Sequence, residues 1–422
     1  MDGKHDSTER QQVEPRLEDK AQLIFDRGQA SRLMAERGID VLLAHTKANV
    51  SYIADYYYDE GWPDFLLEDG ESYYAVFVGV PQERAKEGFI VGCFGEQGCL
   101  AWRDPWIRDR RFWGARFQSD GARPARPPAG SGGEARAAPD RGNPVDVLAE
   151  ALLERGLGEA CIGAEMRHIQ ALYLERLQAL LPRASFVDAE PVLWQMRMRK
   201  SAEEVSRLRV AARAASRAAE AAFKNAYVGM SELDMERIVA KAIVDQGCRY
   251  EWLEIGFGPK GALTVSPTSC QLQEGHIIRL DIGASYRGYI SDISRVAAFG
   301  KVSARAEWAH GVILRANQAL FRAVRPGARP GELRQLVMNI MNEEGLTPLI
   351  PMAGHGLGRG AHEPPFLLEQ EHTILEPGMV ITVEPTIRLP GVGSVNIEDV
   401  LLVTEDGAEC LSTAPRGLYD YI

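Results

Sequence analysis

The chain has 422 residues, of which 45% are apolar and 25% charged, values typical of an ordinary globular protein of two or three domains. Its net charge of −11 argues against nucleic acid as a partner. The longest apolar runs are shorter than a membrane span, the six cysteines are widely spread, and the polar N-terminus lacks the apolar core of a signal peptide. We therefore expect a cytoplasmic protein with no membrane segment.

The first part of the chain, residues 19–195, alternates helix and strand patterns and follows a charged segment, residues 1–18, that we predict to be disordered. Helices are expected at 21–38 and 145–158, and strands at 39–45, 72–81, 87–95 and 159–165. Residues 119–144 are rich in Pro, Gly, Ala and Arg without an apolar period, which predicts a flexible surface loop. The pattern indicates an α/β domain.

Aromatic and acidic residues cluster between Tyr56 and Trp62 in this first part. The ordinary interpretation is a mixture of core and surface aromatics. The functional alternative is a wall beside a substrate, where the rings could face a small cationic or proline-like group.

The second part, residues 196–422, begins with two predicted helices at 201–229 and 231–247. Ser201 with Glu204, and Ser231 with Asp234, have the spacing of a capping box, and the alanine-rich face of the first helix predicts close packing on a sheet. Strands at 250–258, 276–285 and 289–300, helices at 304–324 and 331–345, and two late strand pairs follow. This order predicts an α+β domain with internal pseudo-symmetry.

Two predicted β-hairpins of this second part carry acids within apolar strands. Asp281 and Asp292 are eleven residues apart, with a turn near Arg287 and Gly288, so we expect them opposite each other on one face. Glu384 and Glu398 lie in the later hairpin, and a glycine-rich loop between the hairpins holds His355 and His362. Clustered buried acids repel one another unless cations neutralise them. The set therefore predicts two divalent metal ions, a kind of site that is usually hydrolytic.

Each acid also has an ordinary explanation when it is taken alone. Asp281 could end a strand, Asp292 could pair with Arg295, and Glu384 and Glu398 could form salt bridges. The occurrence of all four inside apolar strands favours the metal site. Carboxylate-rich sites accept manganese, cobalt, iron or zinc, so the identity of the ions stays open.

Four motifs together resemble the superfamily of creatinase, prolidase, aminopeptidase P and methionine aminopeptidase, the pita-bread metallohydrolases. They are DIG with SDISR after it, GHGLG with HEPP after it, VEP, and IEDVLLVTEDG. The resemblance covers about residues 195–422, and the first part looks like the smaller domain of the creatinase and prolidase branches. It implies a homodimer, and five metal ligands: Asp281, Asp292, His355, Glu384 and Glu398, with Asp292 and Glu398 bridging both ions.

The resemblance also implies a function: hydrolysis by a hydroxide that bridges the two ions, at a Xaa-Pro bond, as in a dipeptidase or aminopeptidase. Glu384 would accept a proton, and His362 would contact the substrate or transfer protons.

Three positions depart from the peptidase pattern, because Thr264 and Pro351 stand where peptidases carry histidines and Asn396 where an arginine is common. These departures leave open a hydrolase or lyase of a small non-peptide substrate resembling creatine, ectoine or dimethylsulfoniopropionate. A binding module without catalysis is a third interpretation.

Overall fold

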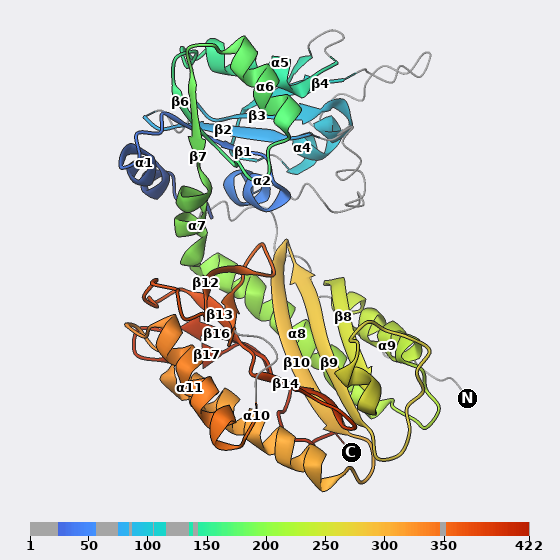
Figure 1. The fold of residues 1–422 in the computed structure, drawn as a ribbon. Helices are drawn as coiled ribbons and strands as arrows, with labels where there is room; N and C mark the ends of the chain where they lie inside the picture. Colours follow the sequence, from blue (N-terminus) through green and yellow to red (C-terminus); the bar gives the residue numbers. More distant parts are fainter. Residues whose placement is uncertain are drawn as a thin grey trace, which may run out of the picture.

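The computed structural model describes residues 24–55, 75–83, 87–103, 105–114, 135–137, 142–346 and 352–421. Figure 1 shows two parts along the chain, one drawn in blue to green and one in light green to red, with helix α7 (Glu190–Met198) between them. The predicted tail, the Tyr56–Trp62 cluster and Pro351 lie outside the described residues. The predicted domain limits at residues 19, 195 and 196 stay predictions.

The first part is built on a seven-stranded mixed sheet in the order β5-β4-β3-β2-β1-β6-β7. Every residue of β1, β2 and β3 is buried, as expected for central strands covered on both faces. The strands are β1 Val41–Ala44, β2 Phe77–Pro81, β3 Phe89–Cys93, β4 Asp109–Trp113, β5 Ala135–Ala137, β6 Cys161–Ala164 and β7 Ser185–Asp188. The helices are α1 Arg27–Ala35, α2 Lys47–Ala54, α4 Gln97–Arg103, α5 Pro144–Leu153 and α6 Ala171–Leu180, with a 3-10 turn η2 at Phe94–Glu96.

The prediction of a loop over residues 119–144 is wrong at two places. Strand β5 lies inside this range and pairs in parallel with β4, from Arg110 opposite Ala135 to Phe112 opposite Ala137. An edge strand needs only free backbone N–H and C=O groups, so it can form without an apolar alternation in the sequence. Helix α5 also begins at Pro144, the last residue of the range.

The second part begins with helices α8 (Ala202–Lys224) and α9 (Glu232–Val244), and both predicted capping boxes are present at Ser201 and Ser231. Most alanines of α8 are buried, and the helix packs on strands β9 (Ile277–Tyr286) and β10 (Tyr289–Ala298), because small side chains let a helix approach a sheet closely. With β8 (Arg249–Phe257), these strands form a three-stranded antiparallel sheet in the order β10-β9-β8. A 3-10 turn, η3 (Gly258–Ala262), follows β8.

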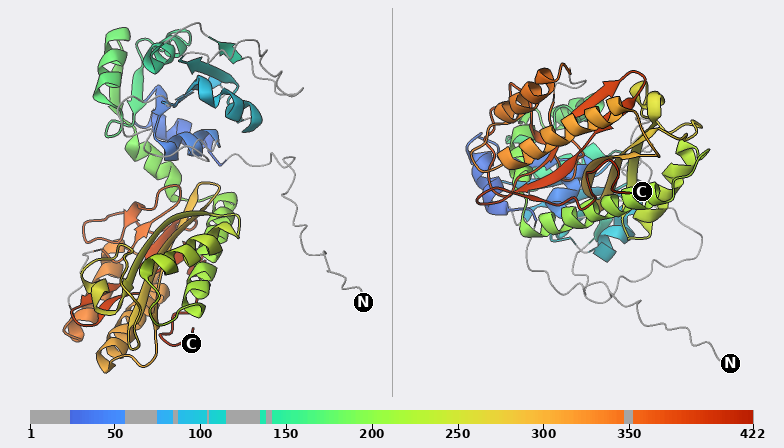
Figure 2. Two further views of the ribbon diagram at one scale, coloured as in Figure 1. Left: turned by 90° about the vertical axis from the view of Figure 1, so that its right-hand side faces the viewer. Right: turned by 90° about the horizontal axis from the view of Figure 1, so that it is seen from below.

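A second sheet of five strands, in the order β12-β11-β13-β16-β17, faces helices α10 (Ala304–Ala323) and α11 (Pro330–Glu343). Its strands are β11 His355–Gly356, β12 Glu363–Phe366, β13 Val380–Val383, β16 Asp399–Val403 and β17 Ala408–Cys410. Strands β14 (Thr386–Leu389) and β15 (Gly393–Asn396) form a two-stranded ribbon between β13 and β16. Two helices followed by antiparallel strands thus occur twice, with the sheets lying between the helix pairs in the views of Figures 1 and 2.

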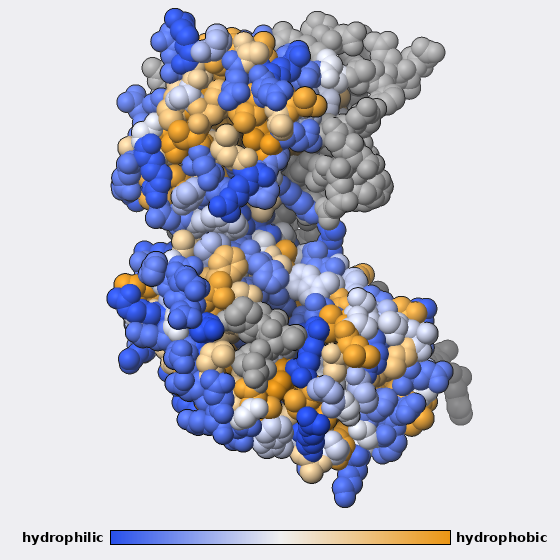
Figure 3. All heavy atoms as spheres, viewed as in Figure 1, coloured by the Kyte–Doolittle hydropathy of each residue, from blue (hydrophilic) through white to orange (hydrophobic). Residues whose placement is uncertain are grey.

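The predicted fold class is confirmed: an α/β first part is followed by a mixed second part with strand pairs that enclose the acids. Figure 3 shows apolar and charged side chains mixed over one face, with apolar ones gathered in the upper part near α6. Among the described helices, none has the length and apolar character needed to cross a membrane.

Candidate metal centre

The first acid-bearing hairpin consists of β9 and β10, joined by a two-residue turn at Arg287 and Gly288, where the φ angles are 48° and 73°. Both residues adopt the left-handed conformation of the turn that best matches strand twist. Asp281 pairs with Ser294, and Asp292 with Gly283. The expectation that the two aspartates stand directly opposite is therefore wrong. The turn fixes a register in which they are diagonal neighbours on the same face.

The second hairpin carries Glu384 and Glu398 in one continuous register. Val383 pairs with Asp399 in β13–β16, and Thr386 pairs with Asn396 in β14–β15, so Glu384 and Glu398 face each other between these pairs. The backbone of Glu398 also exchanges two hydrogen bonds with Ser294 of β10, at 3.0 and 3.3 Å. This bridge brings the second hairpin beside Asp281 and Asp292.

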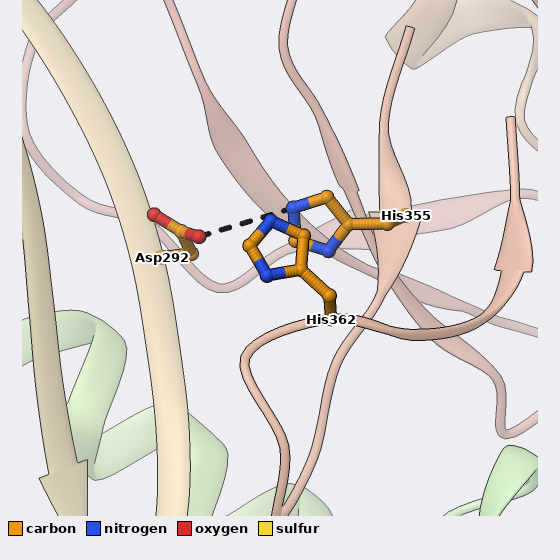
Figure 4. Close-up of side chains that lie close together, drawn as sticks. All are labelled: Asp292, His355 and His362. Atoms are coloured by element: carbon orange, nitrogen blue, oxygen red, sulfur yellow. Dashed lines mark ion pairs between the residues drawn. The ribbon is translucent and has the colours of Figure 1, made fainter. Parts of the chain in front are cut away.

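Both histidines complete the cluster, as Figure 4 shows for their position beside Asp292. The Nε2 atom of His355 lies 3.4 Å from Glu384 Oε1, 3.9 Å from Asp292 Oδ2 and 4.0 Å from Glu398 Oε1. Its Nδ1 lies 3.0 Å from the carbonyl oxygen of Gly356, which favours a proton on Nδ1 and leaves Nε2 free to bind a metal. The exposed His362 lies beside His355, with ring centroids 4.2 Å apart and the ring planes tilted by 38°.

Burial and mutual repulsion set the ionisation of this cluster. Burial, and then the negative charge of Asp281, raise the pKa of Glu384 to about 8. Burial together with neighbouring carboxylates raises the pKa values of Asp292 and Glu398 well above the ordinary range. Burial lowers the pKa of His355 to about 4, so the imidazole is neutral at neutral pH, as a metal ligand must be.

The residues present fit divalent cations. Three buried carboxylate oxygens, Asp292 Oδ1, Glu384 Oε1 and Glu398 Oε1, have no hydrogen-bond partner among the residues that the structure describes. Such orphaned buried acceptors are rare unless a cation or another group satisfies them. The cluster contains three overlapping groups of candidate ligands whose atoms lie within 4.8 Å of one another: Asp292 with His355 and His362, His355 with Glu384 and Glu398, and Asp281 with Asp292 and Glu398. Their assignment as ligands stays a prediction.

A salt bridge explains one of the four acids but not the other three. Arg295 does not pair with Asp292; its guanidinium donates instead to Asp399 Oδ1 at 2.6 Å, on the far side of the strand. Asp281 does have a salt bridge, because Arg279 donates to its Oδ2 at 2.5 Å. Asp292, Glu384 and Glu398 form no ion pair with Lys or Arg among the described residues.

Sequence reasoning missed three neighbours of the cluster. Arg279, 4% exposed, joins Asp281 to Glu254, to which it donates at 2.9 Å. Trp252 donates through Nε1 to Asp281 Oδ1 at 3.3 Å, and its ring lies across Gly283, where a Cβ atom would come within 2.2 Å of it. Arg279 was detectable, because it is two residues before Asp281 and so shares its face of the strand. Glu254 and Trp252 depend on the pairing of β8 with β9, which the sequence does not show.

Arg279 supplies a positive charge beside the candidate ligands. Asn396 stands where the peptidases that the sequence resembles commonly carry an arginine, and here Arg279 brings a guanidinium to Asp281 from β9. Its charge and that of Glu254 cancel, so the four candidate carboxylate ligands still balance two divalent ions. Of the positions that depart from the peptidase pattern, Asn396 is buried, with 1% exposure. Thr264 is exposed on the loop after η3. The next residue, Val265, accepts a hydrogen bond from Ile255 N through its carbonyl oxygen at 2.6 Å.

Removal of divalent ions should give a protein whose stability falls as the pH rises from about 4.5 towards 8. The raised pKa of Glu384, about 8 against 4.5, means that the folded state binds more protons than the unfolded state in this window, so the free energy of unfolding falls with pH. His355 acts in the opposite direction between about 4 and 6.5, but it is one group against several carboxylates.

Metal binding displaces these protons, so affinity for Mn²⁺ should rise over the same window. Melting temperatures with EDTA and with excess Mn²⁺, measured at intervals from about pH 5 to 8, should therefore diverge as the pH increases. A difference that is constant or that narrows would contradict the prediction.

Comparisons with known proteins match both parts of the chain. Residues 206–405 match the metallopeptidase family M24, and residues 106–199 match the creatinase/prolidase N-terminal domain. YkvY of Bacillus subtilis, provisionally named a dipeptidase, is 32% identical over 286 residues, which are 66% of this chain and 78% of YkvY.

Two solved structures are similar over nearly the whole chain. Dipeptidase PepE from Mycobacterium ulcerans, 25% identical, gives a TM-score of 0.73 over 93% of this chain and 96% of PepE. A Xaa-Pro dipeptidase from Bacillus anthracis, 24% identical, gives a TM-score of 0.76 over 93% of this chain and 99% of its own, and this likeness concerns the fold.

Proposed function

The chain belongs to metallopeptidase family M24, and on that premise we propose that it is a metal-dependent dipeptidase or aminopeptidase that cleaves Xaa-Pro bonds with two bound divalent ions. One observation carries the proposal: four carboxylates and a neutral imidazole converge, and three of their buried oxygens have no partner within the described residues. A cluster of this kind is difficult to keep ionised unless cations bind to it. The dipeptidase names of the relatives supply the substrate class.

The candidate ligands are Asp281, Asp292, His355, Glu384 and Glu398. Divalent ions bound there would polarise the scissile carbonyl and lower the pKa of an attacking water molecule. Glu384, at the edge of the cluster with an unpartnered Oε1, would accept the proton of that water.

His362 is exposed and lies beside the ring of His355, so it can reach a substrate that enters from solvent. It would donate a hydrogen bond to the oxyanion or protonate the leaving nitrogen. Asp281 is held in place by Arg279 and Trp252, so its carboxylate is oriented before any ion binds.

The proposal is tested by stripping the protein with EDTA, reloading it with Mn²⁺ or Co²⁺, and assaying release of proline from dipeptides such as leucylproline. We expect turnover that depends on reloading and that is absent from the stripped protein. Full metal loading without hydrolysis of any dipeptide would refute the peptidase assignment.

The exposed Thr264 and the buried Asn396 favour a second candidate, a metal-dependent hydrolase or lyase of a small non-peptide substrate, because both stand where peptidases carry other residues. The same reloaded protein should then act on creatine, ectoine or dimethylsulfoniopropionate and leave dipeptides intact. The homodimer and the cytoplasmic location expected from the sequence stay predictions.

A further inference from the structure

The ribbon formed by β14 and β15 extends from the metal centre and has two distinct faces. Odd-numbered residues of the ribbon, such as Ile387 and Val395, are buried in the apolar core. Even-numbered residues share the face of Glu384 and Glu398, because the register of the hairpin is continuous through both strand pairs. From the metal centre outward, this face carries two cross-strand pairs: Thr386 with Asn396, then Arg388 with Ser394.

This polar face holds side chains without partners. Ser394 is 2% exposed and Asn396 is 1% exposed. The Oγ of Ser394 and the Oδ1 of Asn396 have no hydrogen-bond partner in the described ranges of the chain. The Nε atom of the half-buried Arg388 is also buried and unpartnered. Within the described part of the chain, Arg388 makes no ion pair. Buried polar groups left open beside a reaction centre indicate that a ligand completes them.

We propose that Arg388 determines substrate specificity by binding the free carboxylate of the substrate, with Asn396 and Ser394 contacting the segment between that carboxylate and the metal centre. The inference deepens the proposed function and rests on it. It names the substrate class as short peptides, or comparable small acids, whose carboxylate lies on the leaving-group side.

The charge of Arg388 and its distance from the metal centre both support its role in binding the substrate carboxylate. A carboxylate that enters a site lined by acids needs a cation, and Arg279 is already bonded to Asp281 and Glu254. Arginine suits the role because its planar fork matches a carboxylate. Along a strand, four residues span roughly 13 Å. A leaving group of one or two residues covers about 3.5–7 Å, and the long Arg388 side chain would cover the remainder.

The test compares leucylproline with leucylprolinamide, using the Mn²⁺-loaded wild type and the variants Arg388→Gln and Arg388→Lys. The wild type should prefer the acid by at least about tenfold in kcat/KM. Arg388→Gln should raise KM for the acid by about 10–100-fold, with kcat little changed and the amide unaffected. Arg388→Lys should keep part of the preference, because it retains the charge but loses the fork.

The matched control is Arg305→Gln, which replaces an exposed arginine whose guanidinium contacts Pro390 at the tip of the same ribbon, and it should change neither substrate. A wild type that uses acid and amide equally would overturn the proposal. A preference that persists in Arg388→Gln would do the same, and so would an equal loss on both substrates, which indicates a structural role.

If the proposed peptidase function is wrong, a binding measurement can still test the carboxylate site. If no dipeptide is hydrolysed, the melting temperature of the Mn²⁺-loaded protein is measured with leucylproline, with dimethylglycine and with their amides. An acid that raises the melting temperature when its amide does not, with the effect lost in Arg388→Gln, would support the carboxylate site even without peptidase activity. The acid that stabilises the protein would then show which kind of compound the site binds. Equal shifts with acids and amides overturn it.

Discussion

Glu398→Gln should abolish metal binding and hydrolysis while making the metal-free protein more stable. Glu398 is 1% exposed, and burial and Asp292 raise its pKa well above the ordinary range. Its Oε1 has no hydrogen-bond partner in the part of the chain that the structure describes. Glutamine keeps the shape and is always neutral, so the folded metal-free protein no longer has to protonate a buried carboxylate or hold its charge at this position. Each pKa unit by which a group is raised corresponds to about 1.4 kcal/mol, so the stability of the metal-free protein should rise.

The expected rise in stability together with the loss of activity distinguishes this outcome from misfolding, which would lower both. Calorimetric titration with Mn²⁺ should show loss of the high-affinity signal, and kcat/KM should fall by more than about 10³-fold, as expected for groups that act as a unit. In EDTA the melting temperature should increase by at least about 2–4 °C, the shift for roughly 1 kcal/mol in a large domain. Mn²⁺ should no longer raise it.

Glu405→Gln, an exposed acid at the end of the neighbouring strand, is the matched control and should behave like wild type. Retention of activity in Glu398→Gln would remove Glu398 from the set of ligands. A fall in the melting temperature of the metal-free variant would show that the carboxylate is stabilised by a partner and not by a cation.

The fold and the six candidate residues could be predicted from the sequence, because the acids interrupt apolar strands and the histidines lie in a glycine-rich loop. The helix starts at Ser201 and Ser231 were accessible for a similar reason, since a capping box is a local pattern. Pairing across the first hairpin was predicted only approximately. The tight turn at Arg287 and Gly288 shifts the partner of Asp281 to Ser294, a detail that depends on turn geometry.

Contacts between distant segments could not be predicted, because no local pattern records them. Trp252 and Glu254 reach Asp281 only through the pairing of β8 with β9. Likewise, Glu363, next to the predicted catalytic His362, meets Arg197 from a position 166 residues away. A single sequence shows which residues are chemically unusual for their surroundings, but it does not show which of them lie next to each other in the site.

Glu363→Ala should destabilise the protein by about 3–5 kcal/mol, the usual loss when one partner of a buried ion pair is removed. Glu363 is 1% exposed and accepts hydrogen bonds from Arg197 and from Gly360 N, the latter at 2.6 Å, while Lys200 Nζ lies 3.6 Å from it. Arg197 in turn donates to Asn49 of α2 at 2.8 Å. The carboxylate therefore ties the loop that carries His362 to α7 and to the first part of the chain.

Without Glu363, two buried cations lose their counter-charge, and burial already lowers the pKa of Lys200. Thermal and urea unfolding should show the loss, with a fall in melting temperature of at least about 6 °C. Glu376→Gln is the matched control, because Glu376 pairs with the neighbouring Arg199 at 3.4 Å in an exposed bridge of the kind that contributes less than about 1 kcal/mol.

A second variant tests the cause. Lys200→Met removes one of the two stranded cations, so it should recover part of the stability lost in Glu363→Ala when the two are combined, as a double-mutant cycle measures. Since His362 is adjacent to Glu363, hydrolysis by the folded fraction of Glu363→Ala should also decline. If Glu363→Ala and Glu376→Gln lowered stability equally, the buried carboxylate would not hold the two parts together, and the position of His362 would need another support.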